Sequence, residues 1–415
     1  MWTRKAVTYA GFGTILVLFA PFINNLQLLL LGITLLGFVA IHSLVNTRPV
    51  EVKITRRFSD SQLFEGQETE VDLVIQNRGR PIGCLEVYDQ LPRELGPEKV
   101  ANHTIVRLQR DEVLLARYQL ECHLRGQYTL GRPQLRLYNP SFLFYHESEV
   151  DSTDELVVFP KIEEIEGLDL SSDFPKMYQG AIPIRRVGTS GEFYSIREYY
   201  PGDDFKNINW RVFGRTRKLM VNQFEREDIS DVMLVIDTRE ISGTGTPVHN
   251  PLNYSCRAAA ALTRYFLHTR NRVGLTIYGE TVETISVDSG ERHMYRLLTR
   301  LAELRPAGSL GLHTVIGDLR NFTPRSPVIV ISTLEQDRTV HAALREITAH
   351  GFRLTLIAPD TLEYDRESRI ISPAVYFTAS AELDNTIAEA RSLGARALRW
   401  DPSSVLGPAL QEVVR

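Results

Sequence analysis

Carboxylates that could bind a metal ion lie close together near the middle of the chain. Glu198, Asp203 and Asp204 fall within one short stretch, and hard divalent cations are bound by several carboxylate oxygens. Pro201 and Gly202 lie between them and form a turn signal, and an Asp after such a turn often caps a helix or accepts from backbone N–H groups. The stretch could therefore hold a metal ion, but acidic turns are common, and we interpret it as a structural turn and predict no metal site there.

The residues around this turn also include types that stabilise interfaces. Trp210 and Arg211 are residue types that anchor protein–protein contacts, and Arg197 can pair with the nearby carboxylates. We expect a clasp that buries Trp210 and Arg197 against the domain that follows. The alternative is a surface on which a partner docks.

Several common enzyme motifs are absent from the sequence. There is no G-x-x-x-x-G-K-[ST] phosphate loop, no H-E-x-x-H zinc motif and no G-x-S-x-G nucleophile elbow; the run 188–191 (Gly-Thr-Ser-Gly) is one residue too short for the elbow. The ten histidines show no ligand pair at i, i+4 backed by a carboxylate. We therefore predict that the protein is not an enzyme and has no cofactor.

The net charge of the chain argues against a protein that coats nucleic acid. The chain has 47 Lys and Arg against 51 Asp and Glu, a formal net charge of -4, whereas such proteins carry a basic surplus. A short basic run follows Trp210, but the acidic residues after it offset its charge, so we expect no nucleic-acid partner. The basic residues are Arg211, Arg215, Arg217 and Lys218, and the acidic ones are Glu225, Glu227 and Asp228.

The elements that position these residues begin with a membrane segment. Residues 6–47, 42 in all, contain no Asp, Glu, Lys or Arg, and one helix needs about 20 apolar residues to cross a bilayer. The stretch fits two spans, 6–23 and 26–45, that reverse at Pro21-Phe22-Ile23-Asn24-Asn25. A cleavable signal peptide is the alternative, but the apolar stretch is twice as long as one requires. Residues 1–48 are thus predicted to be a transmembrane hairpin in contact with membrane lipid.

Flanking charges predict the orientation of this hairpin. Arg4 and Lys5 precede the first span and Arg48 and Lys53 follow the second, and basic residues stay on the cytoplasmic side. The three cysteines, too few and too far apart for a disulfide framework, favour a reducing compartment. We therefore expect a cell-membrane protein with two spans and both termini in the cytoplasm.

Two folded domains are expected after the hairpin. Residues 49–160 contain short segments of alternating apolar and polar residues separated by turn signals, which predicts an antiparallel β-sandwich. We interpret it as a spacer, with a recognition module as the alternative. Residues 230–415 alternate apolar strands (232–236, 273–278, 328–332, 354–357) with helical segments (252–269, 294–304, 340–349, 379–393). This predicts a doubly wound α/β domain. A linker segment, 161–229, joins them.

The linker resembles the signature of the DUF58 family. That signature reads approximately R-E-Y-x-P-G-D, then I-N-W and basic residues, and the run 125–131 (Arg-Gly-Gln-Tyr-Thr-Leu-Gly) looks like the R-G-x-Y-x-L-G step of the same family. The resemblance implies a membrane protein whose α/β domain is von Willebrand factor A-like and whose partner is a MoxR-type AAA+ ATPase. The matching positions are Arg197, Glu198, Tyr199, Pro201, Gly202, Asp203, Ile208, Asn209, Trp210 and Arg211.

The resemblance also raises a second metal question. Metal-binding von Willebrand A domains use D-x-S-x-S after the first strand, plus a Thr and a further Asp. Here Asp237 keeps the first position, but Arg239 and Ile241 replace the serines, Thr314 matches the Thr, and Ser332-Thr333 stands where the last Asp is expected. These positions lie at the carboxyl edge of the predicted α/β sheet, which we call the rim. We therefore expect the rim to be a degenerate metal site with no functional metal, in which Asp237 pairs with Arg239 or a neighbouring backbone donor.

Two classes of function follow. The first is a membrane-anchored, non-catalytic adaptor that presents its α/β domain to the ATPase. The alternative is a metal-dependent ligand-binding or hydrolytic domain. The metal content of the purified protein discriminates between them, since the adaptor requires no stoichiometric Mg²⁺ or Mn²⁺.

Overall fold

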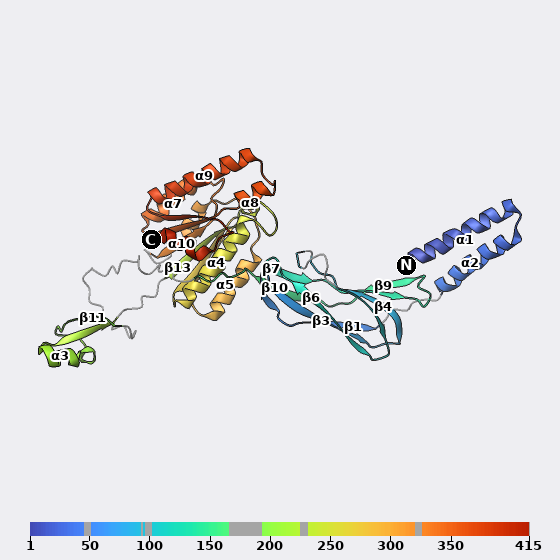
Figure 1. Cartoon of the computed structure of the whole chain (residues 1–415), viewed down its shortest axis with the longest axis horizontal. Coiled ribbons are helices and arrows are strands. Elements are labelled where there is room, and N and C mark those ends of the chain that lie inside the picture. Colours follow the sequence, from blue (N-terminus) through green and yellow to red (C-terminus); the bar gives the residue numbers. More distant parts are fainter. Residues whose placement is uncertain are drawn as a thin grey trace.

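The structure is a computed structural model of the whole chain, and it describes residues 1–44, 51–92, 94–95, 102–165, 193–224, 231–319 and 326–414. Two apolar helices are followed in the sequence by a region of several β-sheets, a small unit (residues 193–224) and a mixed α/β domain; in space the small unit lies at one end of the molecule, beyond the α/β domain (Figure 1). Residues 48, 49, 229 and 230, at which two of the predicted boundaries fall, lie outside the described residues, as do Gly188–Gly191, Glu225, Glu227 and Asp228.

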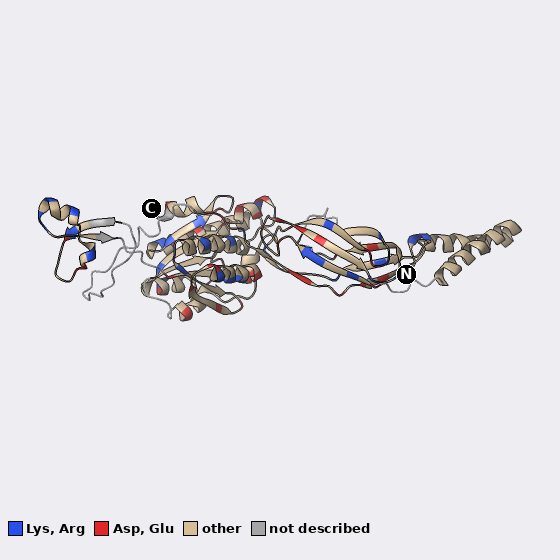
Figure 2. Ribbon diagram, turned by 90° about the horizontal axis from the view of Figure 1, so that it is seen from below, with Lys and Arg blue, Asp and Glu red and all other residues tan. Residues whose placement is uncertain are grey.

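The two N-terminal helices are α1 (Arg4–Ile23) and α2 (Leu26–Leu44), and both are long and apolar enough to cross a membrane. The reversal between them forms as predicted. Asn24 ends α1 in a left-handed conformation (φ 52°), and the Asn25 side chain accepts hydrogen bonds from Gln27 N and Leu28 N at the start of α2. Figure 2 shows charge on this hairpin only near the N-terminus, at the position of Arg4 and Lys5.

Small residues let the two helices approach closely. A Cβ atom on Gly32 would lie 3.0 Å from the Gly13 carbonyl oxygen, and one on Gly13 would lie 3.0 Å from Leu36 Cγ. Such contacts between small residues are typical of helix pairs in membranes.

Ten strands form the β-rich region. They are β1 (Val52–Phe58), β2 (Gln62–Phe64), β3 (Glu68–Asn77), β4 (Ile82–Tyr88), β5 (His103–Leu108), β6 (Val113–Glu121), β7 (Gly126–Leu130), β8 (Gln134–Tyr138), β9 (Tyr145–Glu149) and β10 (Asp154–Phe159). Their orders are β1-β3-β6, β2-β10-β7 and β5-β4-β8-β9. Buried and less buried residues alternate along β3, as in a strand with one face against a core. The sheets share one apolar core that includes Ile54, Val71, Leu85, Leu120 and Leu130.

The pairing departs from the purely antiparallel prediction at one point. β10 runs parallel to β2 while it pairs antiparallel with β7. The chain reaches β10 after a long excursion through the other sheets, and β2 is only three residues long, so its direction is not set by a hairpin turn.

The α/β domain is built on one six-stranded sheet of order β15-β14-β13-β16-β17-β18. All neighbouring strands pair in parallel except β14 and β15. The strands are β13 (Asp231–Asp237), β14 (Arg272–Tyr278), β15 (Val282–Asp288), β16 (Pro327–Ile331), β17 (Arg353–Pro359) and β18 (Arg396–Trp400). Every residue of β13 is buried, which fits a central strand covered on both faces.

Helices cover both faces of this sheet. α4 (Pro251–His268), α5 (Glu291–Glu303) and α10 (Leu406–Val414) lie against the face that holds Leu234. The opposite face, which holds Val235, is covered by η3 (Leu312–Val315), α6 (Ile316–Leu319), α7 (Val340–Ala349) and α9 (Pro373–Ser392). Two shorter helices, η2 (Glu240–Gly243) and α8 (Leu362–Glu367), follow β13 and β17.

A buried arginine of the β-rich region contacts the end of a helix in the α/β domain. Arg125, 6% exposed, donates from Nη1 to the carbonyl oxygens of Leu301 (2.7 Å), Ala302 (3.2 Å) and Leu304 (2.8 Å). It thereby caps the C-terminus of α5, where carbonyl groups lack helical partners and attract cations. This gives a physical role to the first residue of the R-G-x-Y-x-L-G run.

Other contacts support the same joint. The Glu65 carboxylate accepts from Arg125 N (3.0 Å) and Lys161 N (3.0 Å) in its own region and from Arg257 Nε (2.7 Å) of α4. Phe159 of β10 is packed within the core of the α/β domain. The two domains therefore share buried apolar and charged contacts.

Candidate functional site

The signature residues form a small separate unit. β11 (Phe193–Glu198) pairs antiparallel with β12 (Met220–Phe224), and between them lie a turn, η1 (Phe205–Asn207) and α3 (Trp210–Thr216). In Figure 1 this unit projects away from the α/β domain, at the end of the molecule opposite the hairpin.

The turn of this unit is fixed by an ion pair. Arg197 Nη1 and Nη2 donate to the two oxygens of Asp203 at 2.8 and 2.6 Å, and Tyr200 N donates to Asp203 Oδ2 at 2.9 Å. The hydrogen bond from Arg197, followed by that from Tyr200 N, lowers the pKa of the Asp203 carboxyl. Gly202 has φ 113°, a conformation that favours glycine, so the turn accounts for the glycine at this position.

The second half of the signature organises the short helix. Asn209 Oδ1 accepts from Val212 N (3.0 Å) and caps α3, while its Nδ2 donates to Asn222 Oδ1 (2.8 Å) on β12. Ile208 is 4% exposed and forms a bridge with Val221. Asn209 and Ile208 therefore hold α3 against the β11–β12 pair.

What remains on the outside of the unit is aromatic and basic. Trp210 is 62% exposed, Phe205 67% and Tyr200 66%. Arg211, Arg215, Arg217 and Lys218 are also exposed. The prediction that Trp210 is buried against the α/β sheet is wrong, because its indole contacts Phe213 of its own helix at a ring distance of 6.1 Å and otherwise faces outward.

The remaining signature residues occupy exposed or intermediate positions. Glu198 pairs with Lys218 at 3.3 Å on the surface; Tyr199 stacks on Phe205 at 5.9 Å, and Pro201 is exposed. Asp204 accepts from Lys206 N and caps η1, and Asp203 binds Arg197. The carboxylates named as a possible metal cluster are thus engaged in separate structural contacts.

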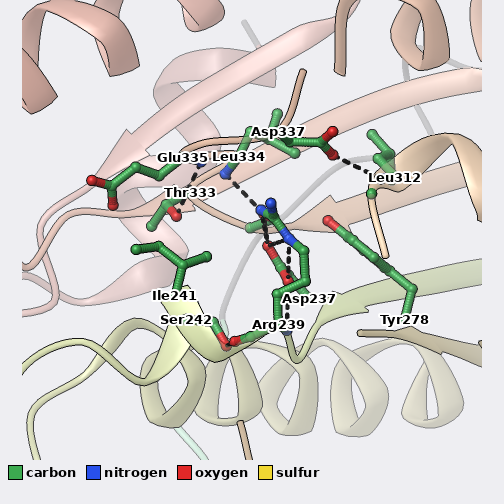
Figure 3. Close-up of polar contacts among 12 residues, drawn as sticks. Asp237, Arg239, Ile241, Ser242, Tyr278, Leu312, Thr333, Leu334, Glu335 and Asp337 are labelled. Carbon is green, nitrogen blue, oxygen red and sulfur yellow. Dashed lines mark hydrogen bonds and ion pairs between the residues drawn. The ribbon is translucent and has the colours of Figure 1, made fainter. Parts of the chain in front are cut away.

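The second candidate site lies at the carboxyl end of β13 (Figure 3). Asp237 and Arg239 are 1% and 4% exposed. Arg239 donates from Nη2 to Asp237 Oδ2 at 2.7 Å, from Nε to Oδ1 at 3.0 Å, and from its backbone N to Oδ1 at 2.9 Å. Ser332 Oγ donates to Asp237 Oδ2 at 2.6 Å. The prediction that Asp237 pairs with Arg239 is confirmed.

The Asp237–Arg239 ion pair determines whether the rim can bind a cation. Burial lowers the pKa of the Arg239 guanidinium, but the hydrogen bonds and charge of Asp237 outweigh it, so the pKa lies above its ordinary value. Both Asp237 oxygens already accept from strong donors. A cation could bind Asp237 only by displacing a buried, hydrogen-bonded arginine.

The rim differs from the sequence prediction in two further residues. Thr314 is exposed on η3, and its hydroxyl donates to Gly311 O at 2.7 Å rather than to Asp237. Asp337, which sequence reasoning missed, is 8% exposed and accepts from Leu312 N (2.7 Å) and Thr339 N (2.8 Å). Within the described ranges, no group of three or more His, Cys, Asp or Glu residues could hold a metal ion.

The chain is similar to uncharacterized bacterial proteins. An uncharacterized protein of Mycobacterium tuberculosis (Rv1480) is 30% identical over 156 residues, which are 37% of this chain and 48% of that protein. The chain thus spans about half the length of its mycobacterial relatives. The uncharacterized protein YeaD of Bacillus subtilis is 21% identical over 279 residues, 64% of this chain and 66% of that protein.

Solved structures match only the general outline of parts of the chain. A CARDB domain from Pyrococcus furiosus is 12% identical, has a TM-score of 0.20 and covers 26% of this chain and 88% of its own. Likeness at this level carries no argument about fold or function. The sequence match is more informative: residues 195–363, from the signature through the rim to α8, match the family described as protein of unknown function DUF58.

Proposed function

We propose that the protein is a membrane-anchored, non-catalytic adaptor. In this proposal α1 and α2 span the membrane, and a von Willebrand A-like α/β domain and the signature unit are presented to a MoxR-type AAA+ ATPase in the cytoplasm. The observation that carries the proposal is the exposed aromatic and basic surface of the signature unit, because Trp, Tyr and Arg are the types that dominate binding energy at interfaces.

Two further features support an adaptor over a metal-dependent domain. Asp237 is saturated by Arg239 and Ser332, so the rim carries its own fixed cation. The signature carboxylates Asp203 and Asp204 serve a turn and a helix cap. Each of these acidic groups has a structural role that accounts for its position.

Binding to the ATPase tests the signature surface. Replacing Trp210 with alanine should leave thermal unfolding nearly unchanged, because the side chain is 62% exposed. It should weaken capture of the MoxR-type ATPase of the same organism by about 2 kcal/mol or more, as expected for an interface anchor. Phe377→Ala is the matched control, since Phe377 is an equally exposed aromatic (68%) on α9. Equal capture by the Trp210→Ala, Phe377→Ala and unaltered proteins would contradict the proposal.

The side of the membrane on which the C-terminal domains lie tests the proposed orientation of the membrane anchor. A reporter fused at Arg415 should give a cytoplasmic signal, because the basic residues flanking both helices keep these ends inside. A fusion in the turn at Asn24 should report from the opposite side. If the C-terminal reporter lies outside the cytoplasm, the α/β domain cannot contact a cytoplasmic ATPase, and the adaptor proposal is wrong.

A further inference from the structure

A small cavity opens at the carboxyl edge of the α/β sheet, beside the Asp237–Arg239 pair. It has a volume of about 180 Å³ and is lined by the segments that follow β13 (Ile241, Thr244), β16 (333–336) and β17 (359–362), together with α8 and α9. For comparison, an apolar cavity of about 150 Å³ can hold a benzene molecule. The cavity therefore has room for a group of about five to seven heavy atoms.

The position of this cavity in the topology favours a binding site. β13 and β16 are neighbours in the sheet, but the chain leaves β13 toward β14 on one side and leaves β16 toward β17 on the other. Open α/β sheets bind ligands where neighbouring strands diverge in this way, outside the carboxyl ends of the strands. The loops that line the cavity come from this point.

The walls of the cavity combine apolar surface with negative charge. Leu334, Leu383, Ile371 and Val375 contribute the apolar part. Four carboxylates also line it, those of Glu335, Asp360, Asp365 and Glu382, and among the described lining residues there is no Lys, Arg or His. The site therefore resembles neither an anion site nor a purely apolar pocket.

Three of these carboxylates form no ion pair with any described residue. Asp360 is paired with Arg399 at 2.7 Å. In contrast, the carboxylates of Glu335 and Glu382 make no hydrogen bond or ion pair within the described part of the chain. Asp365 is 2% exposed, and although its Oδ2 accepts from Thr361, its Oδ1 has no hydrogen-bond partner among the described residues.

Of the unpaired carboxylates, Asp365 is buried and Glu335 is half-buried, whereas Glu382 lies exposed at the mouth of the cavity, so the cost of an unpaired charge falls on Asp365 and Glu335. The pKa of Glu335 is raised, first by burial and then by the negative charge of Glu382. The positive charge of Arg239 opposes this rise, and the negative charge of Asp365 adds to it. Burial likewise raises the pKa of Asp365. In Figure 3 Glu335 points away from Arg239 and Asp237, so the internal arginine does not neutralise it directly. Such an arrangement is stabilised by a cation supplied from outside.

We propose that this cavity binds an organic cation, a protonated amine or a guanidinium group carried on a short alkyl chain. The charged head would lie among Glu335, Glu382 and Asp365, and the alkyl part would contact Leu334 and Leu383. A bare metal ion fits less well, because it would gain nothing from the apolar wall and hard cations require a shell of oxygens. This site is separate from the signature surface and does not rest on the adaptor function.

Titration of the full-length protein in detergent tests the site directly. Butylammonium and propylguanidinium should bind with millimolar affinity, while 1-butanol, which has the same alkyl chain without the charge, should bind at least about tenfold more weakly. The double variant Glu335→Gln/Glu382→Gln should weaken binding of both cations by about tenfold or more. Glu291→Gln is the control, since it removes one exposed charge on α5, away from the cavity.

Three outcomes would overturn the proposal. Absence of cation binding, equal binding of 1-butanol, or undiminished binding in the double variant would each exclude a cation site in this cavity. A second probe, Nα-acetyl-lysine amide, distinguishes the source of the ligand. Tighter binding of this probe than of butylammonium indicates a side chain of a partner protein, and weaker binding indicates a free small molecule; both support the cation site.

Discussion

Replacing Asp237 with alanine should destabilise the α/β domain by about 3–5 kcal/mol, because the variant leaves Arg239 buried without its counter-ion. Arg239 is only 4% exposed and donates four hydrogen bonds to the Asp237 carboxylate, one of them from its backbone N. A guanidinium does not lose its proton to escape this cost. Thermal or denaturant unfolding of the full-length protein in detergent measures the effect.

A double variant separates the lost charge balance from a general loss of packing. Asp237→Ala combined with Arg239→Met removes both charges, so it should be markedly more stable than Asp237→Ala alone. Ser332→Ala, which removes the hydrogen bond to Asp237 and the one accepted from Leu334 N, should cost about 2 kcal/mol, less than Asp237→Ala. If the double variant is as unstable as the single one, the ion pair is not the reason for the loss.

Replacing Arg125 with alanine should cost about 3 kcal/mol and should loosen the joint between the two domains. The variant removes the donor that serves three carbonyl groups at the end of α5. Hydrogen exchange should therefore accelerate over the last turn of α5 and over β7, which begins at the next residue. Unfolding should also separate into two transitions, because each domain keeps its own core.

Two variants make this result interpretable. Arg264→Ala removes an exposed arginine of α4 whose contact with Glu164 is 3.5 Å long, and it should change stability by less than about 1 kcal/mol. Arg125→Lys keeps the charge but not the forked donor geometry, so it should fall between the alanine variant and the unaltered protein. Unchanged exchange at α5 in Arg125→Ala would show that the cap does not hold the joint.

The parts of the fold that were predictable are those with a strong local pattern. The uncharged stretch gave helices α1 and α2 nearly to their ends, and the Asn24–Asn25 reversal follows from side chains that can cap. The continuous apolar run of β13 identified a strand covered on both faces. In these segments the chemical reason for the structure lies within a few residues.

Features that depend on distant contacts were missed. β15 is the edge strand of the sheet and pairs antiparallel with β14; its β-branched residues, Val282, Thr284, Ile285 and Val287, are typical of a strand and were overlooked, but its antiparallel direction depends on the pairing with β14. Asp337 joins the rim through Leu312 N, which is 25 residues away in the chain. Trp210 was expected to be buried because the signature was interpreted as a clasp against the α/β domain, yet its exposure depends on which residues pack against it. No local pattern reports on such contacts.

The N-terminal hairpin is attached to the β-rich region at two places. The chain runs from α2 into β1, and in addition Trp2 forms a bridge with Phe144 while Thr3 N donates to Leu143 O at 2.9 Å. A domain attached to a membrane hairpin by a single linker can rotate freely about it, whereas a domain attached at two points tilts together with the hairpin. A force applied by a partner at the far end of the molecule would then act as a torque on the hairpin, with the β-rich region as the lever arm.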